Sequence, residues 1–142
     1  MIVVPLMGCD MTINSRNKGA SFEREVSKLI LDHLGIKTQR QLVQYQQKGL
    51  SDLVGLPGWS VECKRYAKAT TADKKNWWSQ ACYSAKLEHA LPVVIYKLDR
   101  QEIRCIIALQ PHDKLFEIEE YTGTADISFE LWTVLVREML TS

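Results

Sequence analysis

Residues 50–66 read LSDLVGLPGWSVECKRY. Within this stretch, Pro57-Gly58 is typical of a tight turn between two strands. A short apolar run, Leu50 to Leu56, precedes the turn, and Trp59 to Tyr66 follow it with the alternation of apolar and polar residues that is typical of a strand. The pattern therefore predicts a β-hairpin.

The second strand of this hairpin has an apolar and a polar face, because successive side chains of a strand point to opposite sides. The apolar face consists of Trp59, Val61 and Cys63. Ser60, Glu62 and Lys64 share the polar face. Asp52 stands at the start of the first strand, where it can meet Glu62 across the hairpin. Two carboxylates and one amine are therefore expected close together.

This set of groups suits the hydrolysis of a phosphodiester bond. The reaction needs a hard cation to neutralise charge on the phosphate and a water held in line with the leaving oxygen. Mg²⁺ prefers oxygen ligands and is often held by one or two carboxylates with waters and a substrate phosphate. We therefore expect Asp52 and Glu62 to bind Mg²⁺, for which Mn²⁺ can substitute, with the backbone carbonyl of Cys63 as a further ligand. Lys64 would orient the water or contact the scissile phosphate.

The rest of the chain predicts an α/β fold with a central mixed sheet flanked by helices. Its 142 residues fit one domain, which we expect to span residues 15–142 after an N-terminal extension at 1–14. Apolar spacing and turn residues give an α-β-β-β-α-β-β-α order. Besides the hairpin, the expected elements are a helix at 17–34, a strand running into a polar loop at 36–47, a helix at 70–89, a hairpin of 91–98 with 103–109, and a helix at 128–140.

Two segments resemble known nucleases. Asp52 together with Glu62-Cys63-Lys64 resembles the motif of the PD-(D/E)xK nuclease superfamily, in which Asp and Glu bind magnesium and Lys assists the water. Ser51 stands where the motif has proline. Residues 18–25, KGASFERE, resemble the start of the archaeal-type Holliday junction resolvases. The resemblance covers residues 15–98 and implies a single restriction-endonuclease-like domain.

The resemblance also implies two further site residues and a substrate. Glu23 matches the first-helix glutamate that contributes to the metal site of those resolvases, and Gln80 matches a polar residue on the helix after the Glu-x-Lys strand. It implies a homodimer that cuts DNA, preferably four-way junctions, in recombination or repair. One departure concerns substrate choice: Gln44 to Lys48 stand where those resolvases have a basic, serine-containing loop.

The net charge of +1 does not by itself favour nucleic acid, so the distribution of basic residues carries the argument. Basic residues concentrate near the start of the chain and after the Glu-x-Lys motif, whereas acidic residues gather in the last third. The expected DNA contacts are Arg16, Lys18, Arg24, Lys48, Arg65 and Lys68. Trp77 and Trp78 can stack on unpaired bases, although at least one of two adjacent aromatic residues on an amphipathic helix is expected in the core.

The four cysteines lack the spacing of a metal site or of a disulfide framework, which indicates free thiols in a reducing compartment. No apolar run reaches the roughly 18 residues that a membrane span needs, so no membrane partner is expected. The expected location is the cytoplasm; a phage-encoded nuclease would act in the cytoplasm of its host.

Simpler interpretations remain open at this stage. Glu62 and Lys64 can form an ordinary solvated pair, worth about 0 to 1 kcal/mol. The chain can be a restriction, repair or single-strand nuclease of the same superfamily, a non-catalytic DNA-binding module, or a structural interaction protein. The C-terminal helix can close the domain or mediate dimerisation, and an exposed apolar stripe would favour dimerisation.

Overall fold

The computed structural model describes residues 3–42, 49–109 and 121–141, with the backbone alone for residues 3–16 and 122. Its elements, in chain order, are α1 (Val3–Leu34), β1 (Gln39–Arg40), β2 (Leu53–Val54), β3 (Trp59–Tyr66), α2 (Thr71–Glu88), β4 (Leu91–Leu98), β5 (Arg104–Ala108), a 3-10 helix (Tyr121–Gly123), β6 (Thr124–Ser128) and α3 (Phe129–Thr141). The predicted α/β class, both hairpins and the three helices are confirmed.

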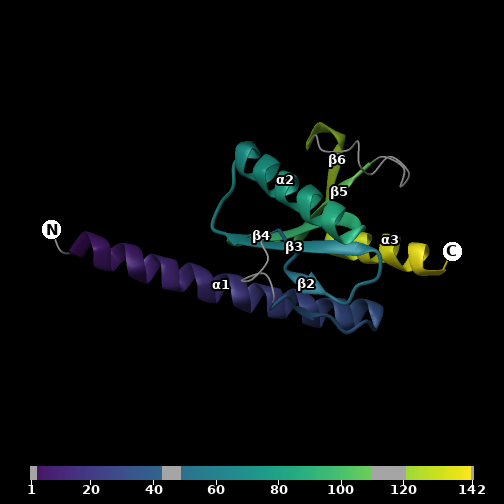
Figure 1. Cartoon of the computed structure of the whole chain (residues 1–142), viewed down its shortest axis with the longest axis horizontal. Coiled ribbons are helices and arrows are strands. Elements are labelled where there is room, and N and C mark those ends of the chain that lie inside the picture. The colour runs from purple at the N-terminus through teal and green to yellow at the C-terminus, as the bar shows by residue number, and fades with distance from the viewer. Residues whose placement is uncertain (1–2, 43–48, 110–120, 142) are drawn as a thin grey trace.

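The strands form one mixed sheet in the order β1-β2-β3-β4-β5-β6. β3 and β4 are parallel, and the other neighbouring strands are antiparallel. A parallel pair needs a long crossover, because the chain must return to the same end of the sheet. Here α2 is that crossover, and it covers one face of the sheet, while α1 and α3 lie on the other face (Figure 1).

The apolar side chains form one cluster on each face of the sheet. The larger cluster joins α1 and α3 to the sheet and includes Phe22, Val26, Ile30, Val61, Phe129 and Trp132. The second lies under α2 and includes Trp77, Trp78, Ala81, Val94, Tyr96 and Ile106. The predicted alternation of β3 is thereby confirmed, because Val61 faces α1 and α3 while its polar neighbours face α2.

α2 is fixed at both ends by local hydrogen bonds. The Thr70 side chain accepts a bond from the Asp73 N–H, and the Asp73 side chain accepts one from the Thr70 N–H. This reciprocal cap satisfies two N–H groups that the first turn leaves unpaired. At the other end, His89 adopts a left-handed conformation and its N–H bonds back to the helix. These caps fix where α2 begins and ends, and so fix which of its residues face the sheet.

Two elements differ from the prediction. α1 begins at Val3 and not at Asn17, and its first turns extend beyond the sheet (Figure 1). Pro5 lies within the first turn, where its missing N–H breaks no helical bond, so it does not stop the helix. Strand β6 was not predicted. Its sequence, TADIS, has little alternation, and its pairing with β5 defines it as a strand.

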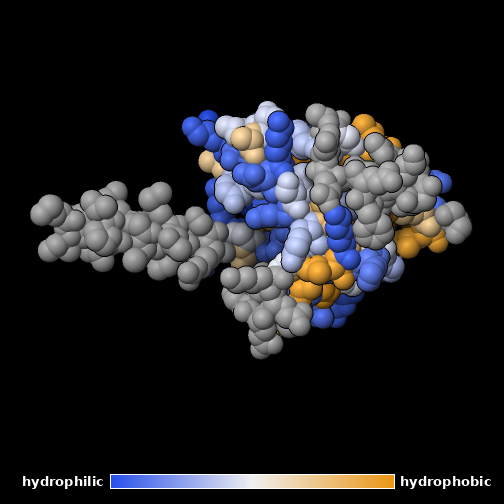
Figure 2. Space-filling view, turned by 45° about the horizontal axis from the view of Figure 1, so that its top comes forward, coloured by the Kyte–Doolittle hydropathy of each residue, from blue (hydrophilic) through white to orange (hydrophobic). Residues whose placement is uncertain are grey.

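The surface over α2 is mostly hydrophilic, whereas hydrophobic side chains appear at the end of the molecule formed by α3 (Figure 2). The exposed apolar residues of α3 are Leu131, Val134, Leu135 and Leu140. Within the described ranges, no helix is both long and apolar enough to cross a membrane.

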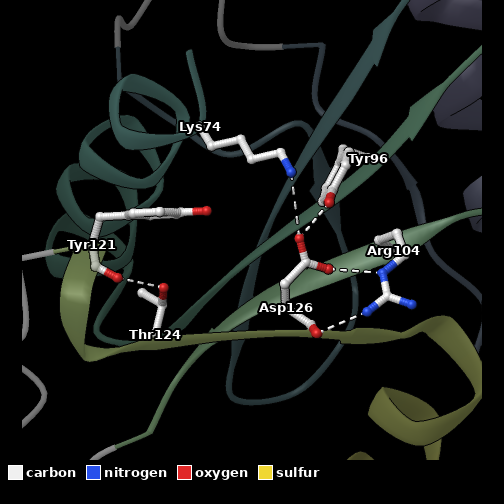
Figure 3. Close-up of polar contacts among 6 residues, drawn as sticks. All are labelled: Lys74, Tyr96, Arg104, Tyr121, Thr124 and Asp126. Atoms are coloured by element: carbon white, nitrogen blue, oxygen red, sulfur yellow. Dashed lines mark hydrogen bonds and ion pairs between the residues drawn. The ribbon is translucent and has the colours of Figure 1, made fainter. Parts of the chain in front are cut away.

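Asp126 joins β6 to β4, β5 and α2 (Figure 3). Its Oδ1 accepts a hydrogen bond from Arg104 Nε at 2.8 Å, and its Oδ2 lies 3.7 Å from Lys74 Nζ. The buried Tyr96 hydroxyl donates to Oδ2. Burial and this hydrogen bond raise the pKa of Tyr96, so its hydroxyl stays protonated and remains a donor. The Asp126 carboxylate therefore helps to hold β6 in the sheet, although the sequence of β6 does not predict a strand.

We expect Asp126→Ala to lower the free energy of unfolding by about 1 to 2 kcal/mol, because the buried Tyr96 hydroxyl and the Arg104 guanidinium both lose an acceptor. Urea denaturation measures the change. Glu102→Ala, at an exposed position near β5, is the control and should stay within about 0.5 kcal/mol of the wild type. Equal stabilities of the two variants would contradict this role of Asp126.

Candidate active site

Asp52 is anchored by backbone pairing on both sides, just before β2. Its N–H donates to the Val61 carbonyl at 2.9 Å, and its carbonyl accepts from the Gln41 N–H at 2.8 Å. Its side-chain Oδ2 accepts a hydrogen bond from the Cys63 N–H at 2.8 Å. The carboxylate is therefore held against the middle of β3.

Glu62 lies in the middle of β3 on the face that α2 covers, and it is 6% exposed. Ser84 of α2 donates its hydroxyl to Glu62 Oε1 at 3.0 Å. The pKa of Glu62 is raised to about 8, chiefly by burial and then by the charge and hydrogen bond of Asp52. Glu62 is thus a carboxyl group that keeps its proton at neutral pH when no cation is near.

Asp52 and Glu62 form a hydrogen-bonded pair of carboxyl groups, as predicted across the hairpin. Two such groups cannot both ionise at short distance unless positive charge compensates them. A divalent cation would supply that charge and replace the shared proton, and carboxylate oxygens are the ligands that Mg²⁺ prefers. The donor set therefore fits a divalent metal ion.

Glu23 faces this pair from α1, but it has a partner of its own. Its Oε2 accepts a hydrogen bond from Arg40 Nε at 2.7 Å. Burial raises the pKa of Glu23; the Arg40 hydrogen bond lowers it, and the charge of Asp52 adds to the rise. Among the described side chains, no three Asp, Glu, His or Cys residues are grouped closely enough to hold one metal ion. The structure thus brings Asp52 and Glu62 together and leaves Glu23 beside them, bonded to Arg40.

Lys64 lies in contact with Gln80, the helix residue that the resemblance to known nucleases implied. Lys64 follows Glu62 by two residues on the same face of β3, and its Nζ donates to Gln80 Oε1 at 2.7 Å. Gln80 lies on α2, one helical turn before Ser84. The amide holds the Lys64 ammonium close to the carboxyl pair and leaves it further protons to donate.

Sequence reasoning missed two residues that contact the site. Ser84 stands four residues after Gln80, the spacing that places two side chains on one helix face, so the pair could have been matched to Lys64 and Glu62. Arg40 follows no recognisable pattern, and only the pairing of β1 with β2 brings it to Glu23.

The predicted DNA contacts occupy different parts of the surface. Lys18 Nζ and Arg65 Nη1 both reach Asp99 Oδ1, at 3.4 and 2.7 Å. Arg24 is exposed on α1 and lines a groove with Ser27, Gln39, Arg40 and Leu42. Lys68 is exposed in the connection from β3 to α2.

Two of the predicted contacts, Lys48 and the Arg16 side chain, fall outside the part that the structure describes. Cys63, Cys82 and Cys105 form no disulfide within the part of the chain that the structure describes.

Comparison with known proteins identifies a family and a fold. The family described as "Phage putative PDDEXK endonuclease" matches residues 14–131. Among solved structures, the Holliday junction resolvase Hjc from the archaeal hyperthermophile Archaeoglobus fulgidus aligns with a TM-score of 0.51 and 14% sequence identity, over 82% of this chain and 98% of that one. No curated protein gives a significant match.

The family match covers most of the chain and includes every residue of the proposed site. The structural match shows the same restriction-endonuclease-like fold, with a mixed sheet and flanking helices. The chain therefore belongs to the family of phage endonucleases within the PD-(D/E)xK nucleases.

Proposed function

We propose that this protein is a metal-dependent DNA endonuclease that cuts branched DNA, with the four-way Holliday junction as its preferred substrate. The observation that carries the proposal is the paired carboxyl groups of Asp52 and Glu62, with the Lys64 ammonium on the same face of β3. An ordinary solvated Glu-Lys pair does not explain this arrangement, because Glu62 is 6% exposed and its pKa is raised to about 8.

Each residue has a definite task in this proposal. Asp52 and Glu62 would hold Mg²⁺ or Mn²⁺, with the Cys63 carbonyl as a further ligand and Glu23 in support. The bound cation would neutralise charge on the phosphate and lower the pKa of a water. Lys64, oriented by Gln80, donates a proton of its ammonium in a hydrogen bond to the attacking water or to a phosphate oxygen. Hydrolysis leaves 5′-phosphate and 3′-hydroxyl ends.

Ser84 and Arg40 keep the acidic groups in position. The Ser84 hydroxyl orients the Glu62 carboxyl toward Asp52. Arg40 orients Glu23 beside the pair, and its positive charge offsets the accumulation of acids. Such supporting partners typically change metal affinity or activity by about 10- to 100-fold when they are removed.

Junction DNA is proposed on the strength of the structural match, since the matched protein is described as a Holliday junction resolvase. Symmetrical cutting of a four-way junction takes two active sites, so a homodimer is proposed as well. The exposed apolar residues of α3 favour association. The alternative is cleavage of single-stranded or ordinary duplex DNA by the same site.

Loss of the Asp52 carboxylate, the Glu62 carboxylate or the Lys64 ammonium should nearly abolish cleavage. We expect Asp52→Asn, Glu62→Gln and Lys64→Ala to lower the cleavage rate roughly 100-fold or more, since metal binding and the positioning of water each contribute several kcal/mol to the barrier. Single-turnover cleavage of labelled four-way junctions in Mg²⁺ and in Mn²⁺ measures the rate. Glu25→Ala and Asp32→Ala, acidic residues exposed on α1, serve as controls that should cut like the wild type.

Other outcomes of this assay would overturn parts of the proposal. DNA binding without cleavage of any substrate would identify a non-catalytic module, and the absence of salt-dependent DNA binding would exclude a nucleic-acid function. Cleavage of linear duplex as fast as of junctions would keep the nuclease and reject the preference for branched DNA.

Stability should depend on pH through Glu62. The folded protein binds the proton of the Glu62 carboxyl more tightly than the unfolded chain does, since folding raises the pKa of Glu62 from 4.5 to about 8. The resulting stabilisation is fully present below the unfolded value and is lost as the pH rises through the folded one. In EDTA, we therefore expect Tm to fall as the pH rises from about 4.5 to about 8. Added Mg²⁺ should recover part of the loss.

Glu62→Gln is the control for this measurement, because its amide does not titrate. It should flatten the fall of Tm with pH, although not completely, because the pKa of Glu23 is also raised and acts in the same direction. The same slope in the wild type and the variant would show that Glu62 is not the titrating group.

A further inference from the structure

Tyr66 lies on the same face of β3 as Glu62 and Lys64, because the three residues alternate in steps of two along the strand. Two residues of a strand span about 7 Å, which is about two base-pair rises of DNA. If Lys64 contacts a phosphate as proposed, this spacing would place the ring within one or two nucleotides of it. Tyr66 is the last residue of β3, and 47% of its surface is exposed.

One face of the Tyr66 ring rests on a buried aromatic column. Trp77 of α2 stacks on it with ring centroids 5.3 Å apart and an interplanar angle of 20°. Trp77 in turn contacts Tyr96 at 5.6 Å, and the Tyr96 hydroxyl is held by Asp126. The orientation of the Tyr66 ring is thus determined before any ligand arrives, so little conformational entropy is lost on binding.

The sequence pointed to Trp77 and Trp78 as candidates for stacking on bases. Both are buried, Trp77 at 6% and Trp78 at 0% exposure, so neither ring is available to a ligand. Trp77 instead supports a ring that is available. An exposed aromatic ring that lies flat on another is the arrangement on which a further flat ring can stack.

Basic residues lie close to Tyr66 at the end of β3. Lys68 is exposed two residues further along, and Arg65 lies beside it, donating Nη1 to the Tyr66 carbonyl at 2.8 Å. Arg65 and Lys18 of α1 also pair with Asp99, whose carboxylate offsets part of their charge. A stacking surface with neighbouring cations is the combination by which proteins bind single-stranded nucleic acid.

We infer that Tyr66 is a stacking platform for an unpaired nucleobase of the DNA strand that is cut at Asp52 and Glu62. The inference rests on the proposed nuclease function and narrows its substrate class to DNA with unstacked nucleotides beside the scissile phosphate. Such bases occur in single strands and at branch points, whereas continuous duplex keeps them paired and stacked. Tyr66 therefore acts in substrate selection, and the carboxyl pair acts in the chemistry.

The test measures binding separately from cleavage. Fluorescence anisotropy in EDTA gives dissociation constants for single-stranded DNA, a four-way junction and linear duplex. Tyr66→Ala and Tyr66→Leu should weaken binding of single-stranded DNA roughly 5- to 100-fold, the range for loss of one base-aromatic stack, with duplex binding nearly unchanged. Tyr66→Phe should bind like the wild type, because it keeps the ring.

Tyr83→Ala is the matched control. Tyr83 is also exposed, at 58%, but it lies on α2 against Gly49. This variant should bind all three DNAs like the wild type. Thermal unfolding of each variant checks the fold, and Tyr66→Leu preserves an apolar contact with Trp77 if Tyr66→Ala is unstable. A loss for the junction as well would identify the branch as a source of the unpaired base, and a loss for single-stranded DNA alone would identify single strands.

Two results would overturn the inference: equal weakening of all three DNAs by Tyr66→Ala, or no weakening of any. Cleavage by the wild type in Mg²⁺, measured in parallel, separates this inference from the proposed function. If the wild type cuts DNA while Tyr66→Ala binds every substrate normally, only the stacking platform is rejected. If the wild type cuts no DNA, the nuclease proposal itself is rejected.

Discussion

Strand β3 pairs with β2 on one side in antiparallel fashion and with β4 on the other in parallel fashion, and the whole site depends on this double pairing. The antiparallel partner brings Asp52 against the middle of β3. The parallel partner requires a crossover, and the crossover helix α2 places Ser84 and Gln80 over Glu62 and Lys64. The site on β3 is therefore completed by side chains from segments that precede and follow this strand in the chain.

The arrangement has an electrostatic consequence. Asp52 and Glu62 are adjacent, Glu62 is buried, and Glu23 lies close enough to interact with Asp52. Without compensation such a cluster destabilises the folded state, because charges that water would solvate are brought together. The Ser84 hydroxyl, the Lys64 ammonium and the Arg40 guanidinium each offset part of this effect. Strain of this kind is expected where a protein binds a cation, since metal binding relieves it.

The two faces of the sheet serve different purposes. The face toward α1 and α3 is an apolar core, which gives the domain most of its burial. The face toward α2 combines apolar residues with the polar side chains of the site and with the aromatic column under Tyr66. Asp126 secures the far end of this column through Tyr96. The hydrogen bond of Asp126 thus supports Tyr66 indirectly, through Tyr96 and Trp77.

Much of this protein follows from local sequence alone. The alternation of residues 59–66 determines which side chains share a face, and capping residues determine where α2 begins, because both depend on neighbours a few positions apart. For this reason the proximity of Asp52, Glu62 and Lys64 could be predicted from the residues, whereas Gln80 came from the resemblance to known nucleases. Tertiary structure alone decided the Arg40–Glu23 pair, strand β6 and the stacking of Tyr66 on Trp77. Each of these depends on contacts between segments far apart in the chain, and no short-range pattern encodes the distance between such segments.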